Sequence, residues 1–183
     1  MIMTVPELRR FVETDTEDRA LEAMLQALEL SIRAYTNNNF QVRAFRCVAV
    51  ANDGNTLLCN GPVPFKPGDT LEITESDYME SCLVTVVFVD GNTITVNEQL
   101  AEESGIVLTK VKYPQDVKMG VVNLIKWELN NREKVGVASE SISRHSVTYF
   151  DMGKDNTSMG FPVSLLGFLK PYRKARFGRG LGI

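Results

Sequence analysis

Apolar side chains in the first forty residues recur at steps of three and four, the spacing of one helix face. This face consists of Leu21, Met24, Leu25, Leu28, Ile32 and Tyr35. Thr4–Glu7 and Thr14–Glu17 both have the spacing of a capping box. They predict a short helix over about Pro6–Val12 and a long helix that reaches about Tyr35. The segment Thr36–Asn39 predicts the end of the long helix, because asparagine tolerates the left-handed backbone found there.

The pattern changes to alternation of apolar and polar residues between about Arg43 and Lys112. Asp53-Gly54 and Asp90-Gly91 lie between alternating runs and predict hairpin turns. The predicted strands are Arg43–Ala51, Thr56–Cys59, Thr70–Thr74, Leu83–Val89, Thr93–Val96 and Ile106–Lys112. Five or six short strands in this space indicate a small antiparallel barrel or sandwich.

Helical spacing returns at Gln115 and continues to about Asn131. Its apolar face is formed by Val117, Val121, Leu124, Ile125 and Leu129. The stretch Ser146–Phe150 is strand-like. A short apolar helix over Val163–Leu169 is then predicted, opened by Pro162 and closed by Pro171.

These elements predict an α+β protein in which a small helical bundle carries an inserted β unit. Residues 4–42 and 114–169 would form the helical core, in which Leu21 and Leu28 share a core with Val121 and Ile125. Residues 43–112 would form an inserted antiparallel β barrel or sandwich, and residues 170–183 a flexible basic C-terminal tail.

Composition places the chain among ordinary globular proteins, with 183 residues, 44% hydrophobic and 23% charged. No apolar run approaches the roughly 18–20 residues that span a bilayer. The N-terminus lacks the basic and apolar regions of a secretory signal, so synthesis in a cytoplasm is expected. The net charge of −3 is unevenly distributed. Residues 170–183 hold five basic and no acidic residues, which leaves a net charge of −8 on the first 169.

The residues that usually carry chemistry are sparse. Cys47, Cys59 and Cys82 contain no C-x-x-C pair, which argues against a zinc site or a disulfide framework and predicts buried or half-buried reduced thiols. The only histidine, His145, has no ligand or nucleophile at useful spacing, so a surface or interface position is expected. No enzyme motif is present. We therefore expect no enzymatic activity, no cofactor and no metal, while a catalytic pair formed by tertiary contact stays open.

Four stretches taken together carry a family resemblance: Ala34–Gln41, Gly120–Trp127, Val137–Tyr149 and Leu165–Phe177. In this order and spacing they resemble the head–tail connector (adaptor) proteins of long-tailed bacteriophages of Gram-positive bacteria. The resemblance covers about residues 4–42 and 114–183. The β region departs from it, since minimal members of that family have only a short loop there.

The resemblance implies a structural virion protein located at the head–tail interface and present in the host cytoplasm during assembly. Its partners would be the portal protein, neighbouring copies in a ring of twelve, and a tail-completion or stopper protein. The ring would extend the DNA channel and pass DNA without sequence recognition, and no membrane is involved.

The candidate site residues follow from the same resemblance, in which the C-terminal segment engages the portal. The predicted docking residues are Lys170, Tyr172, Arg173, Lys174, Arg176, Phe177 and Arg179. A possible contact between subunits is assigned to Asn37, Asn38, Asn39, Arg144, His145 and Tyr149. The tail is expected to be disordered or loosely packed until it docks, because it offers little apolar surface against its backbone entropy.

Other interpretations stay open at this point. The tail could be merely solvated or could neutralise DNA phosphates, and the asparagines could be only a helix stop. The alternative function is a nucleic-acid-binding module that uses the β insertion and the basic tail. Against it, the basic residues of the insertion are dispersed rather than clustered: Arg43, Arg46, Lys66, Lys110 and Lys112.

Overall fold

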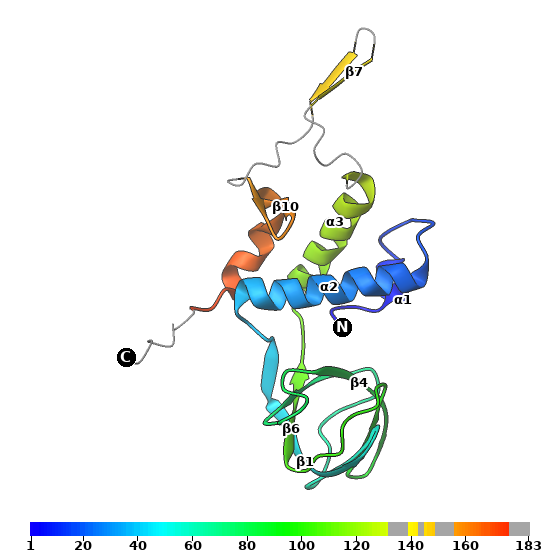
Figure 1. Ribbon diagram of the computed structural model, residues 1–183, viewed down its shortest axis with the longest axis vertical. Coiled ribbons are helices and arrows are strands. Elements are labelled where there is room, and N and C mark those ends of the chain that lie inside the picture. The colour runs from blue at the N-terminus through cyan, green and yellow to red at the C-terminus, as the bar shows by residue number, and fades with distance from the viewer. Residues whose placement is uncertain (132–138, 143–144, 149–155, 176–183) are drawn as a thin grey trace. The chain divides into compact units, whose positions relative to one another are not determined.

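The computed structural model describes the chain except for residues 132–138, 143–144, 149–155 and 176–183 (Figure 1). The chain divides into two compact units. The β unit consists of Met1 with Asn39–Tyr113, and the helical unit of Ile2–Asn38 with Pro114–Ile183. The boundaries thus lie at 39 and 113, where the sequence pattern predicted 43 and 112.

The β unit contains six strands that pair antiparallel throughout. They are β1 (Gln41–Asp53), β2 (Thr56–Cys59), β3 (Thr70–Thr74), β4 (Leu83–Asp90), β5 (Thr93–Val96) and β6 (Ile106–Val111). The hydrogen-bonded order is β1-β2-β5-β4-β3-β6, and β6 pairs with β1 again. A mixed helix-and-sheet protein with a six-stranded antiparallel sheet is therefore confirmed.

Both predicted hairpin turns are present. Asp53 pairs with Thr56, and Gly54 between them has a positive φ of 64°. Asp90 pairs with Thr93 in the same way, with Gly91 at 57°. Two-residue turns of this kind need a left-handed backbone that glycine adopts without steric cost, which is why the Asp-Gly signal located them.

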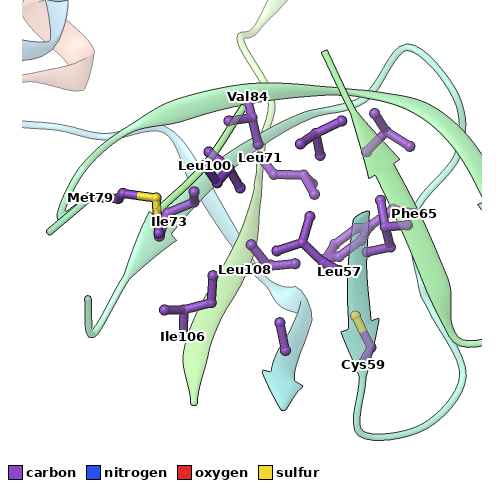
Figure 2. Close-up of a cluster of buried hydrophobic side chains, with 14 residues drawn as sticks. Leu57, Cys59, Phe65, Leu71, Ile73, Met79, Val84, Leu100, Ile106 and Leu108 are labelled. Atoms are coloured by element: carbon purple, nitrogen blue, oxygen red, sulfur yellow. The ribbon is translucent and has the colours of Figure 1, made fainter. Parts of the chain in front are cut away.

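The interior of the β unit is an apolar cluster contributed by all six strands and the loops between them (Figure 2). Its buried members are Ala49, Leu57, Cys59, Phe65, Leu71, Ile73, Met79, Val84, Val86, Ile94, Val96, Leu100, Ile106 and Leu108. Alternate side chains of a strand point to the same face, so the period-two pattern directs one set of residues into a common core.

The helical unit contains α1 (Val5–Leu8), α2 (Asp18–Thr36), α3 (Gln115–Asn131) and the 3₁₀ helix η2 (Val163–Tyr172). Two short strand pairs accompany them: β7 (Ser139–Ile142) with β8 (His145–Thr148), and β9 (Thr157–Ser158) with β10 (Phe161–Pro162). The α2 and α3 faces predicted from spacing are largely buried, and both helices contact η2 and each other. The description of these helices as a connector-like bundle stays a prediction.

The predicted capping box before α2 is wrong. The helix begins at Asp18 after Glu17, which makes no side-chain cap, and the Thr14 hydroxyl bonds to the Thr16 hydroxyl at 2.8 Å. Arg9 holds this loop instead, because its guanidinium donates to the Thr14 and Thr16 carbonyls and to the Asp18 carboxylate. A charged donor with several N–H groups makes stronger hydrogen bonds than a threonine cap.

Two other helix limits also differ from prediction. The first helix is shorter than predicted and ends at Leu8, although Thr4 caps it by accepting from the Glu7 N–H at 3.3 Å. Pro171 does not close the last helix, since η2 continues to Tyr172. A proline next to the final residue removes only one N–H from the helix, and this small loss explains its tolerance.

Close packing between α3 and η2 depends on a glycine. Gly120 is buried in α3, and a Cβ atom added there would overlap the ring of Phe168 in η2. Glycine inside a helix costs about 1 kcal/mol relative to alanine. The close approach of the aromatic ring explains why glycine stands at this position.

Replacing Gly120 with alanine is expected to lower the free energy of unfolding by about 1–2 kcal/mol, because the overlap outweighs the gain in helix propensity. Urea unfolding followed by circular dichroism measures the change. Gly167→Ala is the matched control, since a Cβ there meets nothing within 4 Å. A Gly120→Ala protein as stable as the wild type would show that the ring contact is not a constraint.

Candidate functional site

The segment Lys170–Ala175 is fixed against the C-terminal end of α2. The Lys174 backbone N–H donates to the Thr36 carbonyl at 2.8 Å. The side-chain amides of Asn37 and Asn38 donate to the carbonyls of Ala175 and Tyr172, at 3.0 and 3.1 Å. We call this segment the C-terminal anchor.

The way in which α2 ends makes this arrangement possible. Asn37 adopts the left-handed conformation, with φ of 49°, and its N–H bonds back to the Ala34 carbonyl. The Asn38 N–H bonds to the Arg33 carbonyl at 3.2 Å. These backbone bonds satisfy the last turn of the helix, so the two asparagine side chains are available to hold the anchor. The Thr36 carbonyl, which the helix itself leaves unpaired, is satisfied by Lys174.

A tyrosine joins the same segment to α3. The Tyr172 hydroxyl donates to the Asp116 carboxylate, with distances of 2.7 and 2.8 Å to its two oxygens. This hydrogen bond raises the pKa of the Tyr172 phenol, because ionisation would remove the proton that the carboxylate accepts. Asp116 lies in the first turn of α3, where a negative charge interacts favourably with the helix dipole.

The positive side chains of the anchor are open to solvent. Lys170, Arg173 and Lys174 are all exposed. The Arg173 guanidinium lies 5.1 Å from the centre of the Tyr35 ring, which is within the range of a cation–π contact. Cations near the C-terminal end of α2 also interact favourably with its dipole. The anchor therefore presents a fixed set of positive charges on a folded support.

Four of the seven predicted docking residues lie together in the anchor, namely Lys170, Tyr172, Arg173 and Lys174. Arg176, Phe177 and Arg179 lie outside the described residues. The expectation of a loose tail is wrong for residues 170–175. It counted only apolar anchors, whereas the segment is held by hydrogen bonds from asparagine amides and by the bond between Tyr172 and Asp116.

Four of the six residues assigned to a contact between subunits lie in the described part of the chain: Asn37, Asn38, Asn39 and His145. Asn37 and Asn38 bond within their own chain to the anchor, and Asn39 bonds to Glu72 in the β unit at 2.8 Å. His145 is in β8, while Arg144 and Tyr149 lie outside the described residues. The intrachain bonds account for the asparagines, and a contact between subunits stays a prediction.

Glu72 is a buried charged residue that the sequence pattern did not single out. It lies on β3 with no exposed surface, and its two carboxylate oxygens accept from the amides of Asn39 and Gln41, at 2.8 and 2.9 Å. A buried carboxylate is stable only when it is hydrogen-bonded. The hydrogen bonds hold Asn39 and Gln41 against β3, and this structural role accounts for the buried carboxylate.

The outside of the β unit carries large apolar side chains on three strands. The exposed ones are Phe45, Val48, Val50, Leu58, Val87 and Phe88. Strand β5 lies between β2 and β4. Its Thr93 stands opposite Leu58 of β2, and its Thr95 stands opposite Phe88 of β4. We call these six residues the apolar strand face. Lys110 lies beside Phe45, 5.6 Å from its ring centre, but is paired with Asp69 at 2.6 Å.

The three cysteines differ in their exposure. Cys59 is buried and Cys47 half-buried, as predicted, whereas the same prediction is wrong for Cys82, which is exposed. Among the residues that the structure describes, no cluster of three or more histidine, cysteine, aspartate or glutamate side chains could hold a metal ion. No helix in the described part of the chain is long and apolar enough to cross a membrane.

Comparison with known proteins gives no relative from which a role could be taken, since neither a family model nor a curated protein matches this chain.

Replacing Asn38 with alanine is expected to loosen the C-terminal anchor, because the Tyr172 carbonyl loses its donor. A net loss of about 1 kcal/mol for one hydrogen bond raises the population in which the anchor is detached from α2 by roughly fivefold. Limited trypsin digestion should therefore cleave after Arg173 and Lys174 about five times faster, as measured by mass spectrometry. Asn123→Ala, at an exposed position of α3, is the control. Unchanged cleavage in the Asn38→Ala protein would contradict the assigned contact.

Proposed function

We propose that the protein is a non-enzymatic structural subunit of a tailed bacteriophage virion, a head–tail connector that forms a ring between the portal and the tail. In this role it would extend the DNA channel and provide the platform on which tail-completion proteins dock. The proposal starts from the resemblance of the four sequence stretches that flank and follow the β unit.

The observation that carries the proposal is the C-terminal anchor. A basic segment whose position is fixed relative to its own helices can meet a partner in one orientation. Residues 170–175 have these properties: they bond to α2 and α3 and expose Lys170, Arg173 and Lys174. Such preorganisation lowers the entropic cost of docking on an acidic portal surface.

The apolar strand face supports a protein partner rather than a nucleic acid. Phosphate binding requires clustered cations, whereas the two exposed cations of β1, Arg43 and Arg46, stand on a strand that also exposes Phe45, Val48 and Val50. On β1 and β6, Arg46 donates to the Thr109 hydroxyl at 3.0 Å and Lys110 pairs with Asp69 at 2.6 Å. Large exposed apolar side chains grouped on neighbouring strands are typical of surfaces that other proteins cover. We place the neighbouring subunit or the tail-completion protein at this face.

The test measures binding of the full chain to portal rings of the same virion by analytical ultracentrifugation. Two variants separate the parts of the tail. A chain that ends at Ala175 removes Arg176, Phe177 and Arg179 but keeps the bonds of the anchor. The double variant Arg173→Glu/Lys174→Glu reverses two exposed charges within it.

Each variant is expected to weaken portal binding by about tenfold or more, which corresponds to about 1.4 kcal/mol. Lys66→Glu/Lys112→Glu, which reverses two exposed charges of the β unit, is the matched control and should bind as the wild type does. If the shortened and charge-reversed chains joined portal rings as well as the full chain, the docking role would be refuted. Salt-dependent binding to double-stranded DNA without portal binding would favour the nucleic-acid function instead.

A further inference from the structure

Two cysteines twelve residues apart in the sequence meet in the β unit. Cys47 lies on β1 and Cys59 on β2, and their Sγ atoms are 3.1 Å apart. The register explains the contact. Ala49 lies opposite Cys59. Cys47 precedes Ala49 by two residues on β1, so its side chain points to the same face of the sheet as that of Ala49.

The surroundings of the two sulfurs differ in a useful way. Cys59 belongs to the apolar core (Figure 2) and is only 2% exposed, whereas Cys47 lies half-buried against that core. A reagent in solution therefore has access to Cys47 and not to Cys59. Any modification of the pair must begin at Cys47.

A hydrogen bond also joins the two thiols. Their hydrogen bond lowers the pKa of Cys59 and raises that of Cys47, because the Cys47 S–H stabilises a thiolate at Cys59. A thiolate is the nucleophilic form of cysteine. Once Cys47 carries a mixed disulfide, Cys59 is therefore the sulfur suited to attack it, and the two sulfurs already lie 3.1 Å apart.

We propose that Cys47 and Cys59 form an oxidation site, at which a low-molecular-weight disulfide converts the two thiols into one intramolecular disulfide between β1 and β2. The site is a property of the β unit alone and does not rest on the connector function.

The reaction balances as two exchanges. Cys47 loses its proton, and its sulfur attacks one sulfur of the oxidant R–S–S–R, which forms a Cys47 mixed disulfide and releases one thiolate R–S⁻. Cys59 then loses its proton, and its thiolate attacks the Cys47 sulfur and releases the second R–S⁻. The protein loses two protons and two electrons, and the oxidant takes them up as two molecules of R–S–H.

The geometry permits the bond with a small adjustment. A disulfide needs its sulfurs at about 2.05 Å, so they must approach by about 1 Å. The pairing of β1 with β2 shifts register between Ala49 and Ala51, two residues from Cys47. Such an irregularity interrupts the ladder between β1 and β2 locally. The bond would close a loop that already contains the hairpin turn at Gly54.

The experiment uses the full chain with Cys82→Ser, which removes the exposed third thiol. The protein is incubated with oxidised glutathione, and remaining thiols are alkylated under denaturing conditions. Digestion at Asp53 separates the two cysteines, because Asp53 lies between them in the sequence. The expected result is no alkylation, a mass lower by two hydrogen atoms, and two peptides that stay joined until a reductant is added.

The linked form should also melt about 10 °C higher, since a cross-link restricts the unfolded chain. Cys47→Ser and Cys59→Ser, each combined with Cys82→Ser, are the controls, and neither should gain this increase. Complete alkylation of both thiols after incubation would overturn the proposal. A stable glutathione adduct on Cys47, with Cys59 still free, would overturn it equally.

Discussion

The two ends of the β unit must lie side by side, because the chain enters and leaves it from one helical sequence. Pairing of β1 with β6 meets this requirement, since Gln41 lies opposite Val111. The Lys112 N–H continues the contact by bonding to the Phe40 carbonyl at 3.0 Å. The rings of Phe40 and Tyr113 then pack at 4.8 Å between their centres. A sheet whose first and last strands are neighbours can be inserted into another sequence without separating the parts that flank it.

This junction uses conformations that are unfavourable by themselves. Phe40 has a positive φ of 53°, which is rare for a bulky residue, and Glu72 is a carboxylate with no exposed surface. The amides of Asn39 and Gln41 solvate that carboxylate on either side of Phe40. The strained residue is thus held between two hydrogen bonds, which indicates that the start of the β unit is fixed by polar contacts as well as by its core.

Features encoded by neighbouring residues could be predicted from the sequence, and features formed by distant residues could not. The bounds of β2, β3, β5 and α3 follow from periodicity, Asp-Gly turns and the proline before Gln115, all of which act locally. The missed features depend on contacts that no helix or strand period marks: Arg9 replaces the cap expected at Thr14, five residues away, and Asn38 fixes Tyr172, 134 residues away.

The cysteines illustrate the same limit. Their spacing of twelve residues gave no reason to pair them, and only the strand register brings Cys47 to Cys59. The candidate site was predicted in part, because charge and aromatic content marked residues 170–179. Its support on α2 and α3 came from the structure, since hydrogen bonds between segments leave no periodic signal in a sequence.

The central claim is that the C-terminal anchor is folded on α2 before any partner arrives and is then covered by the portal. Hydrogen–deuterium exchange of the Lys174 amide, in the free chain and in the portal-bound chain, tests this claim most directly. Because that N–H bonds to the Thr36 carbonyl, it should exchange slowly in the free chain and more slowly still in the complex. Exchange at the rate of an unstructured peptide in the free chain, or no added protection with the portal, would contradict the account.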